Sequence, residues 1–243
     1  MIGLVALLVG AGGAVLATGA ASSPADKVNA SDRAAIEAIV RDYILTHPEI
    51  LPEAMQNLEK RESAKRLNEQ GNSLTKPFAG AWEGAADADV TLVEFFDYAC
   101  GYCRTSRPDV DRLLAEDPKL RVVYRELPIL GPVSEQATRA SLAVAKLGNY
   151  GTFHRALFAA GRPSEATINA ALTNAKIDRL AFKAVASSSE IDQEIKANLE
   201  LQRSLNLTGT PSWVIGDQLI NGAVGYDELK AAIAEARAAK AKS

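Results

Sequence analysis

Cys100-Gly101-Tyr102-Cys103 carries the only two cysteines of this 243-residue chain. The apolar run of residues 90–96 before it predicts a buried strand, and residues 104–116 after it predict a helix. A C-x-x-C pair that follows a strand and opens a helix is typical of a thiol–disulfide redox centre. Unpaired backbone N–H groups and the positive end of the helix dipole stabilise a thiolate at such a position. We therefore expect a reactive thiol at this junction, since the thiolate is the species that attacks a disulfide.

Composition narrows the class of protein. An apolar content of 47% and a charged content of 23% are ordinary for a soluble globular chain of one or two domains. The net charge of -3 argues against a nucleic-acid partner, whose binding needs a basic excess. Two cysteines cannot build a disulfide scaffold, and with His47 and His154 they lack the spacing of a four-ligand zinc site. We predict no metal and no other cofactor.

The N-terminus predicts export. Residues 2–20 are apolar and uncharged, and small residues follow them, as in a signal peptide cleaved near Ala20 or Ala21. No Lys or Arg precedes the run, so an uncleaved anchor in the inner membrane through residues 2–20 is the alternative. Under either interpretation of residues 1–22, the rest of the chain faces an oxidising compartment, the periplasm, where a C-x-x-C pair can be held as a disulfide.

Residues 23–74 precede the predicted redox domain as a linker and a helical segment. Helical spacing predicts one helix capped by Asp32 and a second helix from Pro52, with a break between them. The apolar stripe of these helices is narrow, and residues 59–66 are highly charged. The stripe packs either onto the main domain or onto copies of itself. We favour a stalk that forms a homo-oligomer through residues 31–70, because the segment has no place in a strand-helix-strand order.

The remainder of the chain combines strands with many helices. Residues 71–88 predict a loop with one short edge strand near Phe78, and residues 120–127 predict a strand parallel to residues 90–96. Further helices, which look like an insertion between two halves of a sheet, are predicted at residues 134–147, with Ser134 as the cap, and at 150–160, 164–174, 178–186 and 189–205. The chain ends with a strand at 212–215, a turn at 216–217, a strand at 218–220 and a helix at 226–239.

Gly209-Thr210-Pro211 lies directly before the strand at residues 212–215. Together with Phe95-Phe96-Asp97-Tyr98-Ala99-Cys100-Gly101-Tyr102-Cys103 and the helical insertion, it resembles the DsbA-like thioredoxin superfamily. Residues 36–62 resemble the helical segment of the ScsC (copper-sensitivity suppressor) branch. The resemblance implies an α/β thioredoxin-like fold with a helical insertion over residues 75–243, preceded by an N-terminal helical segment. It also implies that Pro211 is cis and lies against the C-x-x-C pair.

The two cysteines are expected to play different roles. Cys100, at the helix N-terminus, is expected to be the more exposed thiol and the attacking thiolate. Cys103, one turn further along, is expected to be more buried and to resolve the mixed disulfide. Strand alternation points Glu94 inward beneath the pair, and the resemblance favours a role in moving the Cys103 proton over an ordinary edge-facing position. Asp97 is expected to be exposed near the strand end.

Four further residues complete the predicted site. Gly101 and Tyr102 are expected to tune the Cys100 thiolate, and Tyr102 offers a hydroxyl group and an aromatic face to a bound peptide. The resemblance implies that Thr210 and Pro211 form a wall beside Cys100. An extended substrate pairs with the backbone at such a wall, as in strand addition.

These features predict an exported thiol–disulfide oxidoreductase whose clients are proteins with thiols or disulfides and which works with a membrane redox partner. An oxidase and an isomerase use the same residues and differ in the direction of electron flow. A homo-oligomer favours the isomerase, because several sites then surround one client. The alternative is a copper-binding thiol chaperone of the same fold, in which both thiolates bind Cu(I). Against this alternative, the chain has only two Met residues and no His- or Met-rich tract.

Overall fold

The computed structural model describes residues 29–241. The predicted signal peptide or membrane anchor in residues 1–22 lies outside this range. The chain divides into two compact units between Met55 and Gln56. Within residues 29–241, no helix is long and apolar enough to cross a membrane.

The first unit contains α1 (Ala30–Thr46) and the start of α2 (Ile50–Gln70). The side chain of Asn29 caps α1 by accepting a hydrogen bond from the backbone N–H of Asp32 at 2.9 Å. The predicted cap at Asp32 is therefore wrong, because Asp32 lies in the first turn, where a negative charge suits the helix dipole. The apolar side chains of α1 are exposed by 50–68%, namely those of Ile36, Ile39, Val40, Tyr43 and Leu45.

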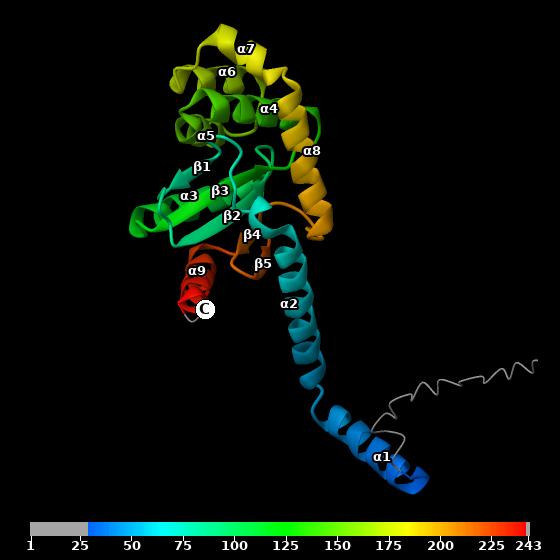
Figure 1. Cartoon of the computed structure of the whole chain (residues 1–243). Coiled ribbons are helices and arrows are strands. Elements are labelled where there is room, and N and C mark those ends of the chain that lie inside the picture. The colour runs from blue at the N-terminus through cyan, green and yellow to red at the C-terminus, as the bar shows by residue number, and fades with distance from the viewer. Residues whose placement is uncertain (1–28, 242–243) are drawn as a thin grey trace, which may run out of the picture. The chain divides into compact units, whose positions relative to one another are not determined.

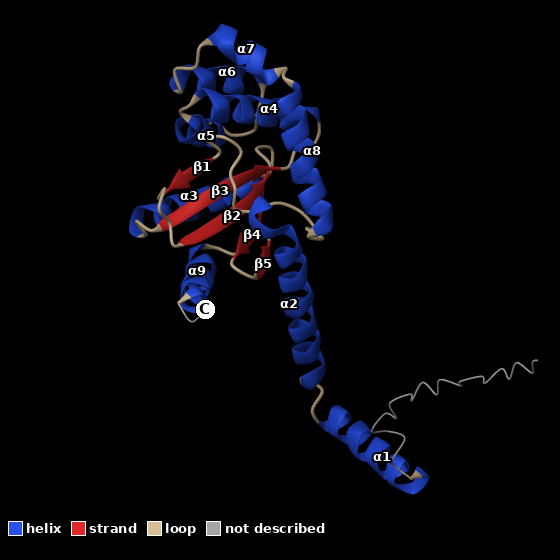
Figure 2. Cartoon of the chain, viewed as in Figure 1, coloured by secondary structure: helices blue, strands red, loops and turns tan. Residues whose placement is uncertain are grey.

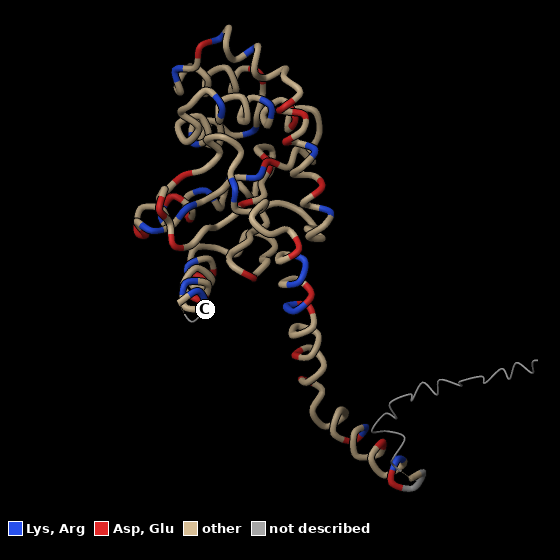
Figure 3. Tube along the Cα trace, in the orientation of Figure 1, with Lys and Arg blue, Asp and Glu red and all other residues tan. Residues whose placement is uncertain are grey.

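The apolar side chains of α2 are exposed in the middle of the helix and buried near its end. Charges of both signs are interspersed over residues 59–66 (Figure 3). Leu58 is 50% exposed, whereas Leu67, near the end of the helix, is buried in the second unit. A short 3-10 helix, Gly71–Ser73, follows α2. The apolar side chain of Leu67 thus packs onto the main domain, whereas Leu58 of the predicted stripe is left exposed.

A five-stranded mixed sheet with the order β1-β3-β2-β4-β5 forms the centre of the second unit (Figures 1 and 2). β2 and β3 are parallel, as predicted, and every other neighbouring pair is antiparallel. The edge strand expected near Phe78 lies slightly later in the chain, at β1. The strands are β1 (Trp82–Gly84), β2 (Val90–Phe96), β3 (Leu120–Glu126), β4 (Ser212–Ile215) and β5 (Gln218–Asn221).

Helices fill the connections of the sheet. α3 (Gly101–Glu116) joins β2 to β3, and α9 (Tyr226–Lys240) follows β5. The predicted helical insertion between β3 and β4 is confirmed. It consists of α4 (Pro132–Leu147), α5 (Tyr150–Ala159), α6 (Glu165–Asn174), α7 (Arg179–Ala186) and α8 (Ser189–Ser204).

The start of α4 corrects one prediction. Ser134 is not its cap but a buried residue inside the helix. Gly131 occupies the cap position with φ of 103°, a conformation that favours glycine. Pro132 follows in the first turn, where the missing N–H of proline costs no helix hydrogen bond. A glycine-proline start therefore replaces the expected serine cap.

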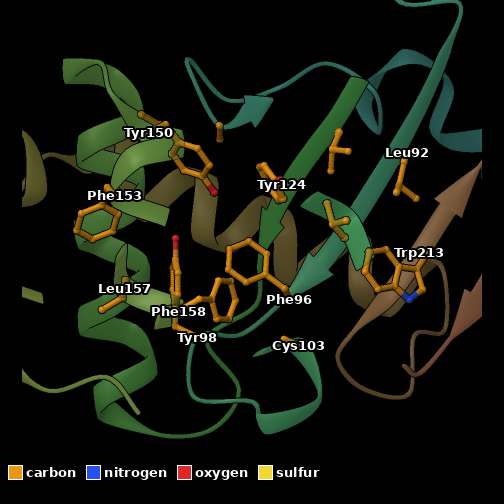
Figure 4. Close-up of a cluster of buried hydrophobic side chains, with 14 of the residues drawn as sticks. Leu92, Phe96, Tyr98, Cys103, Tyr124, Tyr150, Phe153, Leu157, Phe158 and Trp213 are labelled. Carbon is orange, nitrogen blue, oxygen red and sulfur yellow. The ribbon is translucent and has the colours of Figure 1, made fainter. Parts of the chain in front are cut away.

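Both faces of the sheet are covered. One face packs against α3, α5 and α9, and its large buried side chains include Trp213, Tyr124 and Phe96 (Figure 4). The other face packs against the end of α2 and against α8, through Leu67 and Leu205 among others. β2 and β3 are buried along almost their whole length because neither face meets water. This is the α/β fold with a helical insertion that the sequence predicted.

Arg125 of β3 ties the segment after α2 to α8. Its guanidinium group donates to the carbonyl oxygens of Lys76 at 2.7 Å and Leu74 at 3.3 Å, and also to that of Ser73. It forms a buried ion pair with Glu194 of α8 at 2.9 Å. A guanidinium group in the interior needs such partners, because an unpaired buried charge is costly. Arg125 thus fixes the path by which the chain enters the sheet.

Candidate active site

Cys100 and Cys103 lie where β2 passes into α3. Cys100 is the N-cap of α3 and has an extended backbone, with φ of -76° and ψ of 121°. Cys103 lies in the first turn of the helix. Cys100 is 7% exposed and Cys103 is 0% exposed, so the expected order of exposure is confirmed. Both are free thiols.

The surroundings of Cys100 favour its thiolate. The neutral thiol donates to the carbonyl oxygen of Thr210, with 3.2 Å between Sγ and the oxygen. The pKa of Cys100 is lowered to about 5, first by the hydrogen bond from the Cys103 thiol and then by hydrogen bonds from the Thr210 side chain and the backbone N–H groups of Cys103 and Tyr102. Burial opposes this shift. Cys100 is therefore ionised at neutral pH.

The surroundings of Cys103 favour its neutral thiol rather than the thiolate. Burial raises the pKa of Cys103, and the hydrogen bond to Cys100 and the negative charge of Glu94 raise it further. The Cys103 thiol therefore keeps its proton at neutral pH. Two thiols three residues apart, at the start of the same helix, thus carry different charges.

The Thr210–Pro211 peptide bond is cis, as the resemblance implied. It lies directly before β4, which pairs with β2 in the sheet. This pairing brings Thr210 next to Cys100 across a separation of 110 residues. Pro211 is buried and its carbonyl oxygen accepts a hydrogen bond from the backbone N–H of Gly222 at 2.8 Å, whereas the carbonyl oxygen of Thr210 faces the thiol.

Gly101 and Tyr102 lie on the surface beside Cys100. Tyr102 is 72% exposed. Gly101 is exposed as well, and a Cβ atom added to it would meet none of the described atoms within 4 Å. The two central residues of the C-x-x-C pair are therefore open to solvent, whereas both cysteines are buried.

Glu94 lies on the face of β2 that packs against α3. Its neighbours in register are Tyr124 of β3 and Trp213 of β4. It is 1% exposed, and its Oε2 atom has no hydrogen-bond partner within the described part of the chain. Burial raises the pKa of Glu94 to about 8, although the positive charge of Arg107 opposes the shift. The expected inward position is confirmed, and the carboxyl group changes its protonation state close to neutral pH.

Asp97 corrects a prediction, because it is 1% exposed rather than exposed at the strand end. Its Oδ1 atom accepts a hydrogen bond from the backbone N–H of Ala99 at 2.8 Å. Its Oδ2 atom accepts from the backbone N–H groups of Ile129 at 3.0 Å and Leu130 at 3.1 Å. These donors replace water around the carboxylate. Asp97 thereby joins the C-x-x-C turn to the loop after β3, where the Ile129 and Leu130 side chains are 39% and 46% exposed.

A buried chain of hydrogen bonds behind the site was missed at the level of sequence. The hydroxyl group of Tyr98 lies 2.8 Å from Ser141 Oγ and 2.8 Å from His154 Nδ1, and Ser141 donates to Glu126 at 2.9 Å. Burial lowers the pKa of His154 and raises the pKa of Glu126 to about 7. The chain joins the turn before Cys100 to α4 and α5. Its members are far apart in sequence, so no local pattern connects them.

The described residues offer no metal centre of protein ligands. Within residues 29–241, no three or more His, Cys, Asp or Glu residues are grouped so that they could hold a metal ion. The two thiols supply two ligands, whereas structural zinc in proteins takes four. One ionised thiol and one protonated thiol within a helical turn are suited to exchange between sulfur atoms.

Two protein families match successive parts of the chain. Residues 32–65 match the N-terminal domain family of copper resistance protein ScsC, and residues 91–234 match the DSBA-like thioredoxin domain family. Among solved structures, a mutant of ScsC from Proteus mirabilis whose linker is deleted is 30% identical to this chain. Its TM-score is 0.69, and the match covers 87% of this chain and 98% of that one.

Curated relatives include disulfide and transport proteins. Disulfide bond formation protein D of Bacillus subtilis is 25% identical, and the match covers 62% of this chain and 73% of that protein. The Na(+)/H(+) antiporter NhaA 3 of Salinispora tropica is 27% identical over 63% of this chain, but the chain spans only 24% of the antiporter's length. The thioredoxin-domain match includes Cys100, Cys103, Thr210 and Pro211 and extends over more than half of the sequence. The chain belongs to the DsbA-like thioredoxin family of thiol–disulfide oxidoreductases and carries an ScsC-type N-terminal domain before the thioredoxin domain.

Proposed function

We propose that the chain catalyses thiol–disulfide exchange in exported client proteins through the Cys100–Cys103 pair. The observation that carries this proposal is the unequal ionisation of the two thiols, since the pKa of Cys100 is lowered to about 5 and that of Cys103 is raised. A thiolate that is stable at neutral pH attacks disulfides and also leaves readily from them. The neighbouring Cys103 thiol keeps its proton, so it does not act as a nucleophile until a mixed disulfide has formed.

The same atoms serve both directions of electron flow. In the reducing direction, the Cys100 thiolate attacks a client disulfide and releases one client thiolate. Cys103 then loses its proton, attacks the Cys100 sulfur and releases the second client thiolate, so two electrons pass to the client. In the oxidising direction, a client thiolate attacks Cys100 of the Cys100–Cys103 disulfide and Cys103 leaves. A second client thiolate then attacks the client sulfur of the mixed disulfide, which forms the client disulfide and releases the Cys100 thiolate. In isomerisation, a second client thiol resolves the mixed disulfide in place of Cys103.

Glu94 is the group to which we assign the Cys103 proton. Cys103 is 0% exposed, so its proton needs an acceptor inside the protein. Glu94 is buried on the sheet face that packs against α3, and its pKa of about 8 lets it both take and return a proton near neutral pH. In the reducing direction the Glu94 carboxylate accepts the proton, and in the oxidising direction the carboxylic acid returns it.

Substrate positioning is assigned to the surroundings of Cys100. The carbonyl oxygen of Thr210 lies beside the Cys100 sulfur, and we assign to Thr210 and Pro211 the backbone at which an extended client segment pairs. Gly101 and Tyr102 lie on the exposed side, and Tyr102 supplies an aromatic face for the client.

Two assays with one variant test the proposal. The wild-type protein should reduce insulin in the presence of a thiol reductant and should reactivate scrambled ribonuclease. Cys100→Ala should lose both activities, because no nucleophile or leaving group then remains at the helix N-terminus. Cys103→Ala should keep the attack step and accumulate mixed disulfides. An inactive wild-type protein would exclude the proposed enzyme.

The cellular compartment of the protein and the direction of electron flow form a second part of the proposal. The apolar residues 2–20 suggest delivery to the periplasm, with a membrane protein as the redox partner. The exposed apolar face of α1 suggests a homo-oligomer through residues 31–70, which favours isomerisation. The equilibrium potential of the Cys100–Cys103 pair against glutathione tests the direction. A strongly oxidising potential is expected for an oxidase, and a pair that stays reduced is expected for an isomerase.

A copper-binding thiol chaperone is the second candidate, favoured by the match of residues 32–65 to a domain of a copper resistance protein. The two thiolates would be its Cu(I) ligands. Titration of the reduced protein with Cu(I) against a competing chelator separates the candidates. Tight binding by a wild-type protein without exchange activity would favour the chaperone, and exchange activity with weak copper binding would exclude it.

A further inference from the structure

Arg107 of α3 shares a helix face with Cys103. The two residues are one turn apart, so both side chains point toward the sheet. Cys103 is 0% exposed and Arg107 is 5% exposed. Beneath this face, Glu94 of β2 and Tyr124 of β3 are direct neighbours in the parallel pair (Figure 4 shows Cys103 and Tyr124). The buried layer between α3 and the sheet therefore holds a thiol, a carboxyl group and a guanidinium group.

Three elements hold the Arg107 guanidinium group in place. Its Nη1 atom donates to the hydroxyl group of Tyr124 at 2.5 Å, and its Nη2 atom donates to Oε2 of Glu83 on β1 at 2.8 Å. Its Nε atom donates to Asp111 on the next turn of α3 at 3.1 Å. Tyr124 also donates to Glu83 at 2.8 Å, and Arg155 of α5 pairs with the other oxygen of Glu83. The cation is thus oriented by a network rather than by one ion pair.

The charges of this network balance without Glu94. Two cations, Arg107 and Arg155, face two carboxylates, Glu83 and Asp111. Glu94 in its acid form therefore leaves the layer neutral. When Glu94 takes a proton from Cys103, the negative charge passes to the Cys103 sulfur, and it leaves the layer only when this thiolate displaces the group bound to Cys100. When Glu94 is ionised, its extra negative charge lies in a layer of low dielectric constant. A nearby cation stabilises the carboxylate there much more strongly than it would in water.

The other groups around Glu94 do not replace this cation. From α3 it faces Cys100, Cys103 and Asp111 in addition to Arg107, and from β1 it faces Glu83. β3 contributes Tyr124, which remains neutral because burial raises its pKa, and β4 contributes the uncharged Trp213. From α5, His154 packs on the Tyr124 ring and is neutral because burial lowers its pKa. The positive charge of Arg107 is the largest influence that lowers the pKa of Glu94.

We propose that Arg107 is a positioning residue for the resolving step, whose buried charge adjusts how readily Glu94 exchanges a proton with Cys103. This inference rests on the proposed dithiol function. A purely structural role would be different, since Arg107 would then only hold α3 against β1 and β3. The electrostatic role predicts that removing the cation and removing its carboxylate partner have opposite effects on the pH dependence of the Cys103 step.

A single-turnover reaction isolates that step. At low pH, Cys100 of the full-length reduced protein attacks the aryl disulfide 5,5′-dithiobis(2-nitrobenzoate), which forms the Cys100–aryl mixed disulfide and releases one 2-nitro-5-thiobenzoate. The released thiolate is removed, and the pH is then raised. Cys103 gives its proton to the Glu94 carboxylate, and its thiolate attacks the Cys100 sulfur. The Cys100–Cys103 bond forms, the bond to the aryl sulfur breaks, and the released aryl thiolate is followed by absorbance. Glu94→Gln assigns the midpoint of the rate–pH profile to Glu94.

Arg107→Met should raise the midpoint by roughly 1–3 pH units, the range that a nearby opposite charge produces in a buried carboxyl group. Arg107→Lys, which keeps the charge, should restore the midpoint toward the wild-type value. Glu83→Gln should lower the midpoint, because it removes a negative charge that faces Glu94 and leaves the Arg107 charge less neutralised. Arg112→Gln, on the exposed side of α3, is the matched control and should leave the midpoint unchanged.

The outcomes separate the inference from the proposed function. If the wild-type protein never releases the aryl thiolate, the dithiol function itself fails. If it releases the thiolate but Arg107→Met and Glu83→Gln shift the midpoint in the same direction, or neither shifts it, Arg107 is only a structural anchor. If Arg107→Met does not fold, Arg107→Gln, which also removes the charge but keeps a polar side chain, takes its place: a higher midpoint supports the inference, and an unchanged or lower midpoint overturns it.

Discussion

Cys100 and Cys103 share one helical turn but meet different surroundings. Cys100 lies at the end of the helix, where donors converge on its sulfur, whereas Cys103 is enclosed by the sheet and by Glu94. The geometry of a helix N-terminus produces this difference directly, because the first backbone N–H groups have no partners within the helix. A C-x-x-C pair at that position therefore needs only a covered inner face to acquire one ionised thiol and one protonated thiol.

Glu94→Gln is expected to change how stability depends on pH. In the folded protein the pKa of Glu94 is about 8, compared with an ordinary value of 4.5. The folded state holds this proton more tightly than the unfolded chain, so stability falls as the pH rises through that window. Through this group alone, the free energy of unfolding of the wild-type protein should fall by up to about 5 kcal/mol. Urea denaturation at a series of pH values measures the change.

Comparison of the two proteins isolates the contribution of Glu94. Burial also raises the pKa of Glu126, to about 7, and this adds a slope of the same sign to both proteins. The difference in unfolding free energy between Glu94→Gln and the wild type should therefore grow in favour of the variant as the pH rises. If the unfolding free energies of the two proteins depend on pH in parallel, Glu94 does not cause the loss of stability at high pH.

At the residue scale, what was predictable depended on where the partners of a side chain lie. Glu94 was placed correctly because strand alternation alone decides which face it occupies. Asp97 was placed wrongly because its partners are the backbone N–H groups of Ile129 and Leu130, which a loop far along the chain supplies. Tyr98 and Arg107 were missed for the same reason, since their partners come from helices and strands that only the fold brings together.

Element boundaries followed local signals with two informative exceptions. β2 and β4 begin and end at the predicted residues, because apolar strand sequences there are bounded by turn residues. The caps at Asp32 and Ser134 were wrong, because α1 offers several capping side chains and α4 begins at a glycine that has none. Backbone geometry selects Asn29 and Gly131 instead, and side-chain type does not determine that choice.

Arg125→Gln is expected to loosen the junction between α2 and the sheet. The change leaves the carbonyl oxygens of Ser73, Leu74 and Lys76 and the carboxylate of Glu194 without their common partner. Breaking a buried ion pair of this kind costs about 3–5 kcal/mol. Urea denaturation should show the loss, and hydrogen exchange should show that protection decreases first around residues 70–78.

Arg121→Gln on the same strand is the matched control. Arg121 also donates to backbone carbonyl oxygens, those of Ala85 and Ala86, but it is only partly buried. Its loss should cost about 1 kcal/mol. Equal losses of unfolding free energy in the two variants would mean that burial of Arg125 and its ion pair with Glu194 add nothing to stability.

On the scale of the whole molecule, the apolar face of α1 is the feature that the thioredoxin domain does not explain. Val40→Glu is expected to reduce the mass of the protein in solution to that of one chain, because it places a charge in the middle of the exposed face formed with Ile36 and Tyr43. Sedimentation equilibrium at several concentrations provides the measurement. An assembled wild-type protein is the expected starting point.

Ala38→Glu places the same charge on the opposite side of α1 and should leave the assembly intact. Reactivation of scrambled ribonuclease should decrease in Val40→Glu, whereas reduction of insulin should not, because only isomerisation gains from several sites around one client. A wild-type protein that is monomeric at all concentrations would end the oligomer hypothesis.

The sequence by itself determined the C-x-x-C spacing, the strand before it, the helix after it and the order of the remaining elements, because each of these depends on contacts or spacings within a few residues. Only the tertiary structure decided the surroundings of the pair. Pairing of β4 with β2 brought Thr210 to Cys100, and packing of α3 on the sheet enclosed Glu94, Cys103 and Arg107 in one layer. Charge and burial act through space, so the pKa of a thiol depends on neighbours that are remote along the chain.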